Sequence, residues 1–340
     1  MAGRFEIDPL SAERRRIRSW WLRADGRLES RLTTEQIAAA ARSGDGTLWV
    51  DLDARGAETE HVLESIFRFH PLAVEDTRSP YGRVKLDDYG DYIFVTARGI
   101  RFVEETATPY DIETSDRHFF VGSHFVVTVH EGTSRAVEEV ATRVETGAAT
   151  IMRSPDHLFY AILDQLVDHY FPVLDEVDEL VDSLEAMIVE PDGTDVMARI
   201  FALKRTLIAL RRHLAPQREL VLSLATRPCR PLRSETQIYF RDIYDHVVRQ
   251  VETIETYRDL LTTALETNLM LVSHRLNEVI KALSIIATIV LPPTLIASAY
   301  GMNFDIIPLA DEPHGFWFAL LLMVAVAAAF LLYLKRKEWL

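Results

Sequence analysis

The sequence lacks the features of a disulfide-bonded, nucleic-acid-binding or secreted protein. Its 340 residues include one cysteine, Cys229, so no disulfide can form within the chain, and a lone thiol is typical of a reducing cytoplasm. The formal net charge of −14 argues against nucleic acid as a partner, because phosphate binding needs a basic surface. No apolar run follows the arginines at positions 14–16, so we identify no secretory signal.

Motifs for enzymatic chemistry are also missing. We find no glycine-rich phosphate loop, no nucleophile elbow and no histidine pair at metal-binding spacing. His130 and Glu131 stand together without the second histidine of a zinc protease, while His118 and His124 fall in or beside predicted strands. We therefore predict that the chain is not an enzyme and holds no organic cofactor.

Helix-breaking residues are absent over a long stretch, since no glycine or proline occurs between Pro231 and Pro292. Ser234 and Gln237 form a capping-box pattern at its start. Apolar residues then recur every three or four positions, which is typical of a helix packed along one side. We predict one stalk helix over residues 233–300, on the order of 100 Å long. Its stripe packs either on its own domain or against other subunits.

Charge is missing from Ala282 to Ala299, and these eighteen residues are about the minimum for a helix that crosses a bilayer. We predict transmembrane helices at about 281–300 and at 316–334, joined by a loop over 301–315 that faces the extracellular or periplasmic side. The tail, 335–340, carries a basic cluster that places both termini in the cytoplasm and the protein in the inner or plasma membrane. This cluster is Lys335, Arg336 and Lys337.

A stripe of small and polar residues follows one face of the first predicted span. Two interpretations remain open, because such residues either line a pore or bond their own helix and allow close packing. The stripe, with its apolar neighbours at steps of three and four, consists of Asn277, Ile280, Leu283, Ser284, Ala287, Leu291, Thr294 and Ser298.

The N-terminal half predicts an α+β cytoplasmic domain, similar to an α/β/α sandwich, over residues 1–150. We expect strands at 47–52 and 92–96, a hairpin over 118–129 and a helix over 58–69. Residues 151–232 predict an acidic antiparallel helix pair, since 154–198 hold twelve acids and no lysine or arginine. Its first member is one long amphipathic helix, and its second ends near Arg227. The acidic face is either simply solvated or concentrates divalent cations near a pore.

Three C-terminal segments resemble the CorA family of magnesium (divalent cation) transport proteins. Residues 277–289 are similar to the family's first transmembrane helix, and 333–340 to its basic tail. Tyr300-Gly301-Met302-Asn303-Phe304 matches the signature loop with its Gly-Met-Asn motif. Two departures concern ion preference rather than fold. The chain has Leu-Pro-Pro-Thr at 291–294 and Ile-Pro-Leu-Ala at 307–310, where the family has Met-Pro-Leu-Thr and Met-Pro-Glu-Leu.

The resemblance implies a funnel-shaped homopentamer in which the polar stripe lines the pore and the basic cluster forms a collar around its cytoplasmic end. It implies an Mg²⁺ channel, with cobalt or nickel as minor cargo, that selects the hydrated ion at the loop of Tyr300, Gly301, Met302 and Asn303. It also implies regulatory Mg²⁺ between neighbouring cytoplasmic domains. The best matching ligands are Asp76 and Asp242, with Glu266 as a weaker third.

Two other functions remain open at this point. The first is a zinc or Co²⁺/Ni²⁺ transporter similar to ZntB, which shares the fold but departs from Gly-Met-Asn. The second, from a different class, is a membrane-anchored sensor or scaffold that conducts nothing and docks a partner through its acidic helices.

Overall fold

The computed structural model describes residues 17–79, 82–103, 110–147, 149–189, 196–302, 313–337 and 339. The chain divides into two compact units, Met1–Thr263 and Ala264–Leu340. The boundary falls inside one helix, α8 (Ser234–Tyr300), which therefore contributes to both units.

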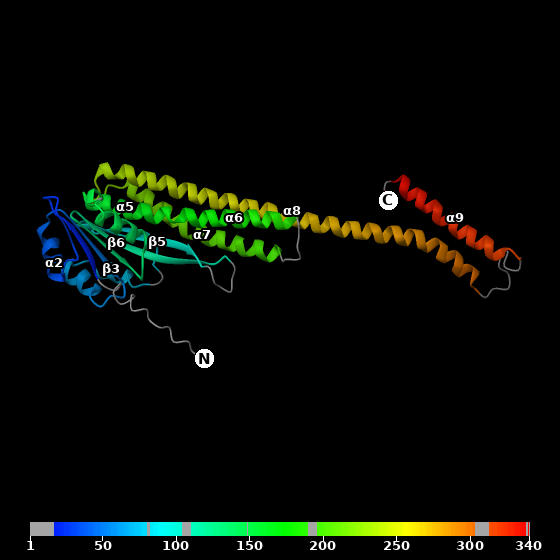
Figure 1. Ribbon diagram of the computed structural model, residues 1–340, viewed down its shortest axis with the longest axis horizontal. Coiled ribbons are helices and arrows are strands. Elements are labelled where there is room, and N and C mark those ends of the chain that lie inside the picture. The colour runs from blue at the N-terminus through cyan, green and yellow to red at the C-terminus, as the bar shows by residue number, and fades with distance from the viewer. Residues whose placement is uncertain are drawn as a thin grey trace, which may run out of the picture. The chain divides into compact units, whose positions relative to one another are not determined.

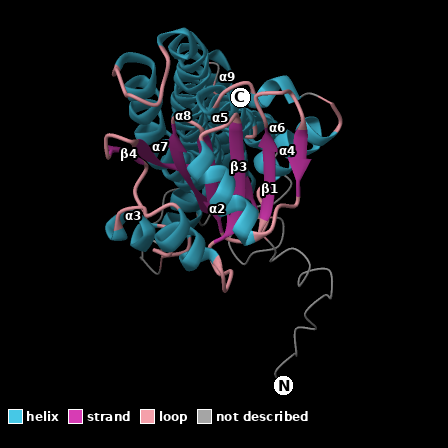
Figure 2. Cartoon of the chain, turned by 90° about the vertical axis from the view of Figure 1, so that its left-hand side faces the viewer, coloured by secondary structure: helices cyan, strands magenta, loops and turns pink. Residues whose placement is uncertain are grey.

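The first unit is built on a seven-stranded mixed sheet with the order β2-β1-β3-β7-β6-β5-β4 (Figure 2). Only β3 and β7 run parallel, and every other neighbouring pair is antiparallel. The predicted hairpin is confirmed, since β6 pairs antiparallel with β7 across a turn at Ser123 and His124. The strands are β1 (Arg18–Leu22), β2 (Leu28–Ser30), β3 (Thr47–Asp53), β4 (Lys85–Asp88), β5 (Tyr92–Phe102), β6 (Ile112–Gly122) and β7 (Phe125–His130).

Helices cover both faces of this sheet, which confirms the predicted α/β/α sandwich. In β3, Leu48, Val50 and Leu52 alternate with Trp49 and Asp51, so successive side chains enter opposite layers. The first three join the core under α2 (Thr34–Ser43), η1 (His61–Ile66) and α3 (Pro71–Asp76). The opposite face packs against α4 (Arg135–Glu145) and α5 (Pro155–Asp168), with η2 (Ala149–Met152) between them.

Three helices of the first unit run side by side (Figure 1): α6 (Tyr170–Val189), α7 (Val196–Thr226) and the first part of α8. Lys204 on α7 donates to Thr262 on α8, at 3.2 Å between nitrogen and oxygen. Arg211 on α7 forms an ion pair with Glu255 on α8, at 3.0 Å. The apolar stripe of α8 therefore packs on its own chain in this unit, which is one of the two predicted arrangements.

Three details differ from the sequence-based expectation. The long helix predicted from residue 154 is two helices, α5 and α6, separated at His169. Pro172 explains the break, because it lacks the N–H that would bond the Asp168 carbonyl. The helix predicted over 58–69 forms a π-helical turn that ends at Ile66. Helix α8 begins at Ser234, which is its first helical residue and not the predicted capping residue, and Gln237 Nε2 donates to the Arg227 carbonyl at 3.1 Å instead of forming a capping box.

The second unit holds the rest of α8 and helix α9 (Gly315–Arg336). Both helices are long and apolar enough to cross a membrane. In α8 the most apolar window has no buried residue, so none of its side chains is fully covered within the single chain. Length and composition thus agree with the two predicted spans.

Candidate cation-transport and regulatory sites

The signature loop begins where α8 ends. Tyr300 is the last helical residue, and the Gly301 N–H bonds the Ala297 carbonyl at 3.0 Å. Gly301 and Met302 are exposed, Met302 by 50%. Asn303 and the rest of the loop up to residue 312 lie outside the described residues. The described part of the motif, Gly301 and Met302, therefore directly follows the first candidate span and is exposed in the single chain.

The polar stripe is exposed along the membrane part of α8. Thr294 Oγ1 donates to the Val290 carbonyl at 2.8 Å, and Thr288 Oγ1 donates to the Ser284 carbonyl at 2.7 Å. A hydroxyl whose proton is used inside the helix presents only oxygen lone pairs outward. Such an oxygen accepts hydrogen bonds from water bound to a cation, so back-bonding to the helix does not exclude a pore-lining role. The exposed members are Asn277, Ile280, Leu283, Ser284, Ala287, Leu291, Thr294 and Ser298.

The basic tail lies near the other end of the predicted span, within the second unit. A hollow of about 530 Å³ is lined from α8 by Asn277, Ile280, Lys281 and Ser284, and from the C-terminus by Lys337 and Trp339. Lys335 and Arg336 form the last turn of α9. The chain thus brings one member of the predicted collar to the residues where the polar stripe starts.

Asp76, the first predicted regulatory ligand, ends helix α3 and already has a cationic partner. Lys85 Nζ lies 2.7 Å from Asp76 and 2.6 Å from Asp87, and all three side chains are about one-third exposed. These groups line an open hollow of about 590 Å³ together with Glu75 and Tyr89. A metal ion at Asp76 would therefore compete with the Lys85 ammonium group for the carboxylate.

The three predicted regulatory residues are divided between two elements and between the two units: Asp76 ends α3, Asp242 lies on the first part of α8, and Glu266 lies on its second part. Asp242 is exposed on α8, and its charge acts on Asp164 of α5. Glu266 is exposed further along α8, beyond the boundary of the first unit. Among the described residues, no hydrogen bond or ion pair joins Asp76 to Asp242. A site made from both needs a second subunit, as the family resemblance implies.

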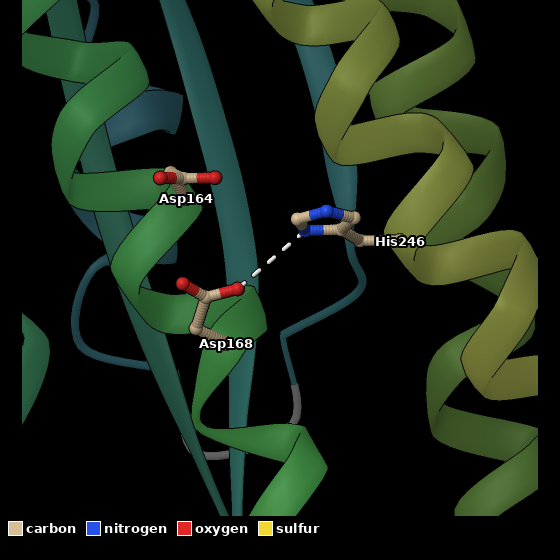
Figure 3. Close-up of side chains that lie close together, drawn as sticks. All are labelled: Asp164, Asp168 and His246. Atoms are coloured by element: carbon tan, nitrogen blue, oxygen red, sulfur yellow. Dashed lines mark ion pairs between the residues drawn. The ribbon is translucent and has the colours of Figure 1, made fainter.

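A different group of possible metal ligands does come together: Asp164 and Asp168 on α5, and His246 on α8 (Figure 3). One ligand atom from each lies within 4.8 Å of the others. His246 Nδ1 is 3.5 Å from an Asp168 carboxylate oxygen and has no hydrogen-bond partner among the described side chains. We call this group the Asp164–Asp168–His246 cluster.

The electrostatics of this cluster favour a cation. Burial raises the pKa of Asp164 to about 6, and the charges of Asp168 and Asp242 add to the shift, while His246 opposes it. A divalent ion between the carboxylates would remove this repulsion. Ligand bonds of about 2.1 Å need donor atoms roughly 3 Å apart, so small side-chain rotations suffice. Two carboxylates suit Mg²⁺, whereas the imidazole adds affinity for zinc, cobalt or nickel.

Sequence reasoning did not single out this cluster, although a signal was present. Asp164 and Asp168 are four residues apart, as are Asp242 and His246, so each pair shares one helix face. What the sequence could not supply is the packing of α5 against α8, which joins residues far apart along the chain.

The other histidines named above have structural roles. His118 is buried in β6 beside Thr96 Oγ1, at 3.1 Å, and burial lowers its pKa to about 4. His124 Nε2 lies 2.8 Å from the Ala41 carbonyl. His130 Nε2 lies 3.0 Å from Asp51, a buried carboxylate that also pairs with Arg18. Each therefore stabilises the sheet or its helices.

Comparison with known proteins identifies the family. The family described as CorA-like Mg²⁺ transporter protein matches residues 44–336. The chain belongs to the CorA family. The cobalt/magnesium transport protein CorA of Thermotoga maritima is 32% identical over 317 residues, which cover 92% of this chain and 89% of that protein. The YfjQ protein of Bacillus subtilis is 33% identical over 291 residues, covering 86% and 89%.

Solved structures agree on the fold. The complete CorA magnesium transporter of Methanocaldococcus jannaschii superimposes with a TM-score of 0.81 at 21% identity, over 95% of this chain and 98% of that one. The predicted α+β domain, long helices and two apolar C-terminal helices are thus confirmed. The chain is a divalent-cation transporter of the CorA family with two candidate membrane spans.

The family also includes proteins named for another metal. The zinc transport protein ZntB of Yersinia pseudotuberculosis is 24% identical over 309 residues, covering 88% of this chain and 90% of that protein. Membership in the family therefore establishes divalent-cation transport without identifying the preferred cation.

Proposed function

We propose that this CorA-family chain assembles into a homopentameric channel that admits hydrated Mg²⁺ to the cytoplasm through the inner or plasma membrane. The observation that carries the proposal is the course of α8, which extends from Ser234 to Tyr300 and leads directly into Gly301-Met302-Asn303. The signature residues thus follow a candidate span whose side chains lack cover in one chain. Five copies of α8 would cover one another and surround a pore.

Selection at the pore entrance rests on an uncharged ring. Mg²⁺ releases its water reluctantly, so recognition of the hydrated ion avoids the cost of dehydration. The Asn303 carboxamide oxygens accept hydrogen bonds from metal-bound water. A carboxylate ring would instead enter the inner coordination shell and delay release of the ion. Below the ring, Thr294 and Ser298 offer further oxygen acceptors, and Leu291, Leu283 and Ile280 form apolar collars that close by dewetting.

Gating follows from metal that binds the closed assembly better than the open one. In our proposal, Mg²⁺ bridges Asp76 of one subunit and Asp242 of the next, with Glu266 as a further acid along α8. The Asp164–Asp168–His246 cluster adds negative charge beside Asp242, as the effect of Asp242 on Asp164 supports. When cytoplasmic Mg²⁺ is low, repulsion between these acids separates the subunits and opens the pore.

The test of transport uses the purified full-length protein in liposomes. Asn303→Ala should abolish Mg²⁺ uptake while the oligomer stays intact by size and native mass. Asn268→Ala is the matched control, because it removes the same amide from α8 ahead of the uncharged segment, and it should retain uptake. Uptake by Asn303→Ala at the wild-type rate would disprove the assignment of the selectivity ring.

Zinc transport is the second candidate, because the chain is 24% identical to a protein named for zinc transport. The imidazole in the Asp164–Asp168–His246 cluster suits zinc, cobalt or nickel better than magnesium, but it bears on a regulatory ion and not on the transported one. Flux of Mg²⁺, Zn²⁺ and Co²⁺ measured in the same liposomes separates the candidates, and we expect Mg²⁺ to pass fastest. Faster zinc flux would favour a ZntB-like zinc transporter over the magnesium channel. Absence of all flux would favour a non-conducting sensor or scaffold.

A further inference from the structure

A second polar cavity lies in the first unit, away from the proposed transport route. Its volume is about 1290 Å³, and it is bounded by the end of α3, strands β5 and β6, and helix α7. Five arginines line it: Arg55, Arg78, Arg83, Arg98 and Arg212. We call it the arginine cavity.

The residues that line the arginine cavity carry a net positive charge, whereas the whole chain is acidic. Five arginines and three acids, Glu113, Asp116 and Glu131, are among the residues that line the cavity, which leaves an excess of two positive charges. The full chain has a formal net charge of −14. A basic hollow on an acidic protein attracts anions and does not serve the cation pathway.

Two of the arginines are free to bind a ligand. Arg98 is held by Asp116 at 2.7 Å, Arg78 by Glu60 at 2.7 Å, and Arg55 by Glu131. In contrast, Arg83 and Arg212 are exposed and have no ion pair or hydrogen bond from their side chains to any described residue. A free guanidinium fork matches the paired oxygens of a phosphate group.

Arg98 determines which ring nitrogen of His213 carries the proton, and this adds a hydrogen-bond donor to the residues that line the cavity. Arg98 Nη1 lies 3.2 Å from His213 Nδ1, and a guanidinium can only donate, so Nδ1 is the acceptor. Burial and the charges of Arg98 and Arg212 lower the pKa of His213, which keeps the ring neutral. The proton therefore sits on Nε2, as a donor on a side chain that lines the cavity.

Hydroxyl groups complete the polar wall. Ser79 and Thr114, which carry hydroxyl groups, also line the cavity. The excess of two positive charges, the neutral imidazole donor and these hydroxyls together match a small dianion with several acceptor oxygens. A phosphate group carries about −1.5 to −2 charges at neutral pH and three such oxygens.

We propose that the arginine cavity binds a phosphate-bearing anion. The phosphate group comes either from an inorganic ion or from a nucleotide, and the recognising groups are the same for both. The proposal concerns binding by the cytoplasmic unit and stands independently of which cation passes the pore.

The test measures binding to the full-length protein in detergent, treated with EDTA to remove metal, at low ionic strength. The probes are inorganic phosphate, pyrophosphate and ATP, with sulfate as a competitor. Calorimetry measures the binding of each probe. Wild-type protein should bind pyrophosphate at one site per chain. Arg83→Gln and Arg212→Gln should each weaken binding roughly tenfold, the loss expected for one charged hydrogen bond.

Arg249→Gln is the matched control, because Arg249 is an exposed arginine on α8 outside the cavity wall. It should bind pyrophosphate as the wild type does. Tighter binding of ATP than of pyrophosphate would assign the phosphate to a nucleotide, and equal or weaker binding to an inorganic ion. Equal losses in all three variants would reveal a general counterion effect and overturn the proposal. Absence of binding to the wild type would overturn it too, including the case in which a neighbouring subunit fills the cavity.

Discussion

In the proposed gating mechanism, Lys85 would set the charge that a regulatory cation meets at the end of α3. It pairs with Asp76 and Asp87 at 2.7 and 2.6 Å, so the Asp76 carboxylate is partly neutralised within each subunit. These side chains are about one-third exposed, and such pairs contribute about 0.5–1 kcal/mol. If Mg²⁺ closes the channel as proposed, that energy is enough to shift the Mg²⁺ concentration at which it closes.

Replacing Lys85 therefore changes gating in a defined direction. Lys85→Gln frees Asp76, and we expect half-inhibition of flux at an Mg²⁺ concentration lower by roughly threefold to fivefold, which corresponds to about 0.7–1 kcal/mol. The double variant Asp76→Ala with Asp242→Ala should lose Mg²⁺ inhibition. The measurement is flux in liposomes against Mg²⁺ on the cytoplasmic side. Inhibition unchanged in both proteins would show that other residues hold the regulatory ion.

Asp164 makes stability depend on pH near neutrality. Its pKa of about 6 in the folded protein exceeds the ordinary value of 3.8 because of burial and the nearby Asp168 carboxylate. The ionised side chain therefore costs stability above pH 6, and this cost fades as the pH falls through 6 towards 4. In metal-free protein, Asp164→Asn should increase the free energy of unfolding at pH 8 by about 1 kcal/mol after solvent screening, seen as a higher thermal midpoint.

The same substitution should have little effect on the midpoint near pH 4, where the wild-type carboxyl group is protonated in the folded state. Asp91→Asn serves as control, because the Asp91 side chain is 94% exposed and should show no such pH profile. A stabilisation of Asp164→Asn that is equal at pH 8 and pH 4 would contradict the electrostatic explanation. Added Mg²⁺ should reverse the difference at pH 8, because the ion favours the wild-type carboxylate.

At the scale of elements, one buried carboxylate fixes where α8 starts. Asp156 on α5 is 1% exposed and accepts hydrogen bonds from the Arg233 backbone N–H at 3.1 Å and from Thr236 Oγ1 at 2.6 Å. The Arg233 guanidinium adds bonds of 3.0 and 3.1 Å. Burial alone raises the pKa of Asp156, but these bonds outweigh it and lower the pKa to about 2.

Loss of this carboxylate should loosen the long helix from the sheet domain. Asp156→Ala leaves buried donors without acceptors, and we expect the first unit to lose roughly 2–4 kcal/mol, seen as a lower thermal midpoint. Because the pKa is depressed, the stabilisation is present above pH 4 and is lost as the pH falls towards 2. Glu235→Ala, an exposed residue in the first turn of α8, is the control and should unfold as the wild type does. Equal midpoints in all three proteins would contradict this role.

The helices and strands also show which parts of the fold could be predicted from the sequence alone. The length of α8 was predictable, because no glycine or proline interrupts it before Pro292 and its apolar spacing persists. Strand β3 was predictable from a dense run of apolar residues. The break between α5 and α6 was missed because apolar periodicity continues across His169, although Pro172 removes a backbone donor there. The π-helical turn of η1 has no distinct pattern, since its bonding depends on packing under the sheet.

The candidate sites also differ in whether the sequence alone could predict them. Signature and stripe residues lie consecutively or at helical spacing, so sequence reasoning could propose them, and the described part of the chain places most of them on one exposed helix. The Asp164–Asp168–His246 cluster and the arginine cavity join residues from separate elements. Such sites depend on which helices pack together, and that information lies in the tertiary fold.

On the scale of the whole molecule, the candidate membrane span of α8 is largely exposed in the single chain. The apolar window of α8 has no buried side chains, and the polar stripe is as exposed as its apolar neighbours. In a bilayer, polar groups are expensive against lipid and tend to face an interior or water. The proposed oligomer would resolve this problem by turning the stripe inward, while the apolar remainder would pack against other helices and lipid.

Accessibility to a water-soluble thiol reagent distinguishes the two faces of α8. In a Cys229→Ser background, Thr294→Cys should react with a charged methanethiosulfonate and lose Mg²⁺ flux, because its side chain faces the aqueous pore. Leu295→Cys, one position further and 73% exposed in the single chain, should face lipid or the second helix and stay unmodified. Cys229 itself is buried, so its replacement removes little background reactivity. If Leu295→Cys reacts and Thr294→Cys does not, the stripe faces away from water. The ring of Asn303 amides would then lack an aqueous route beneath it, and a pore along this face of α8 would be excluded.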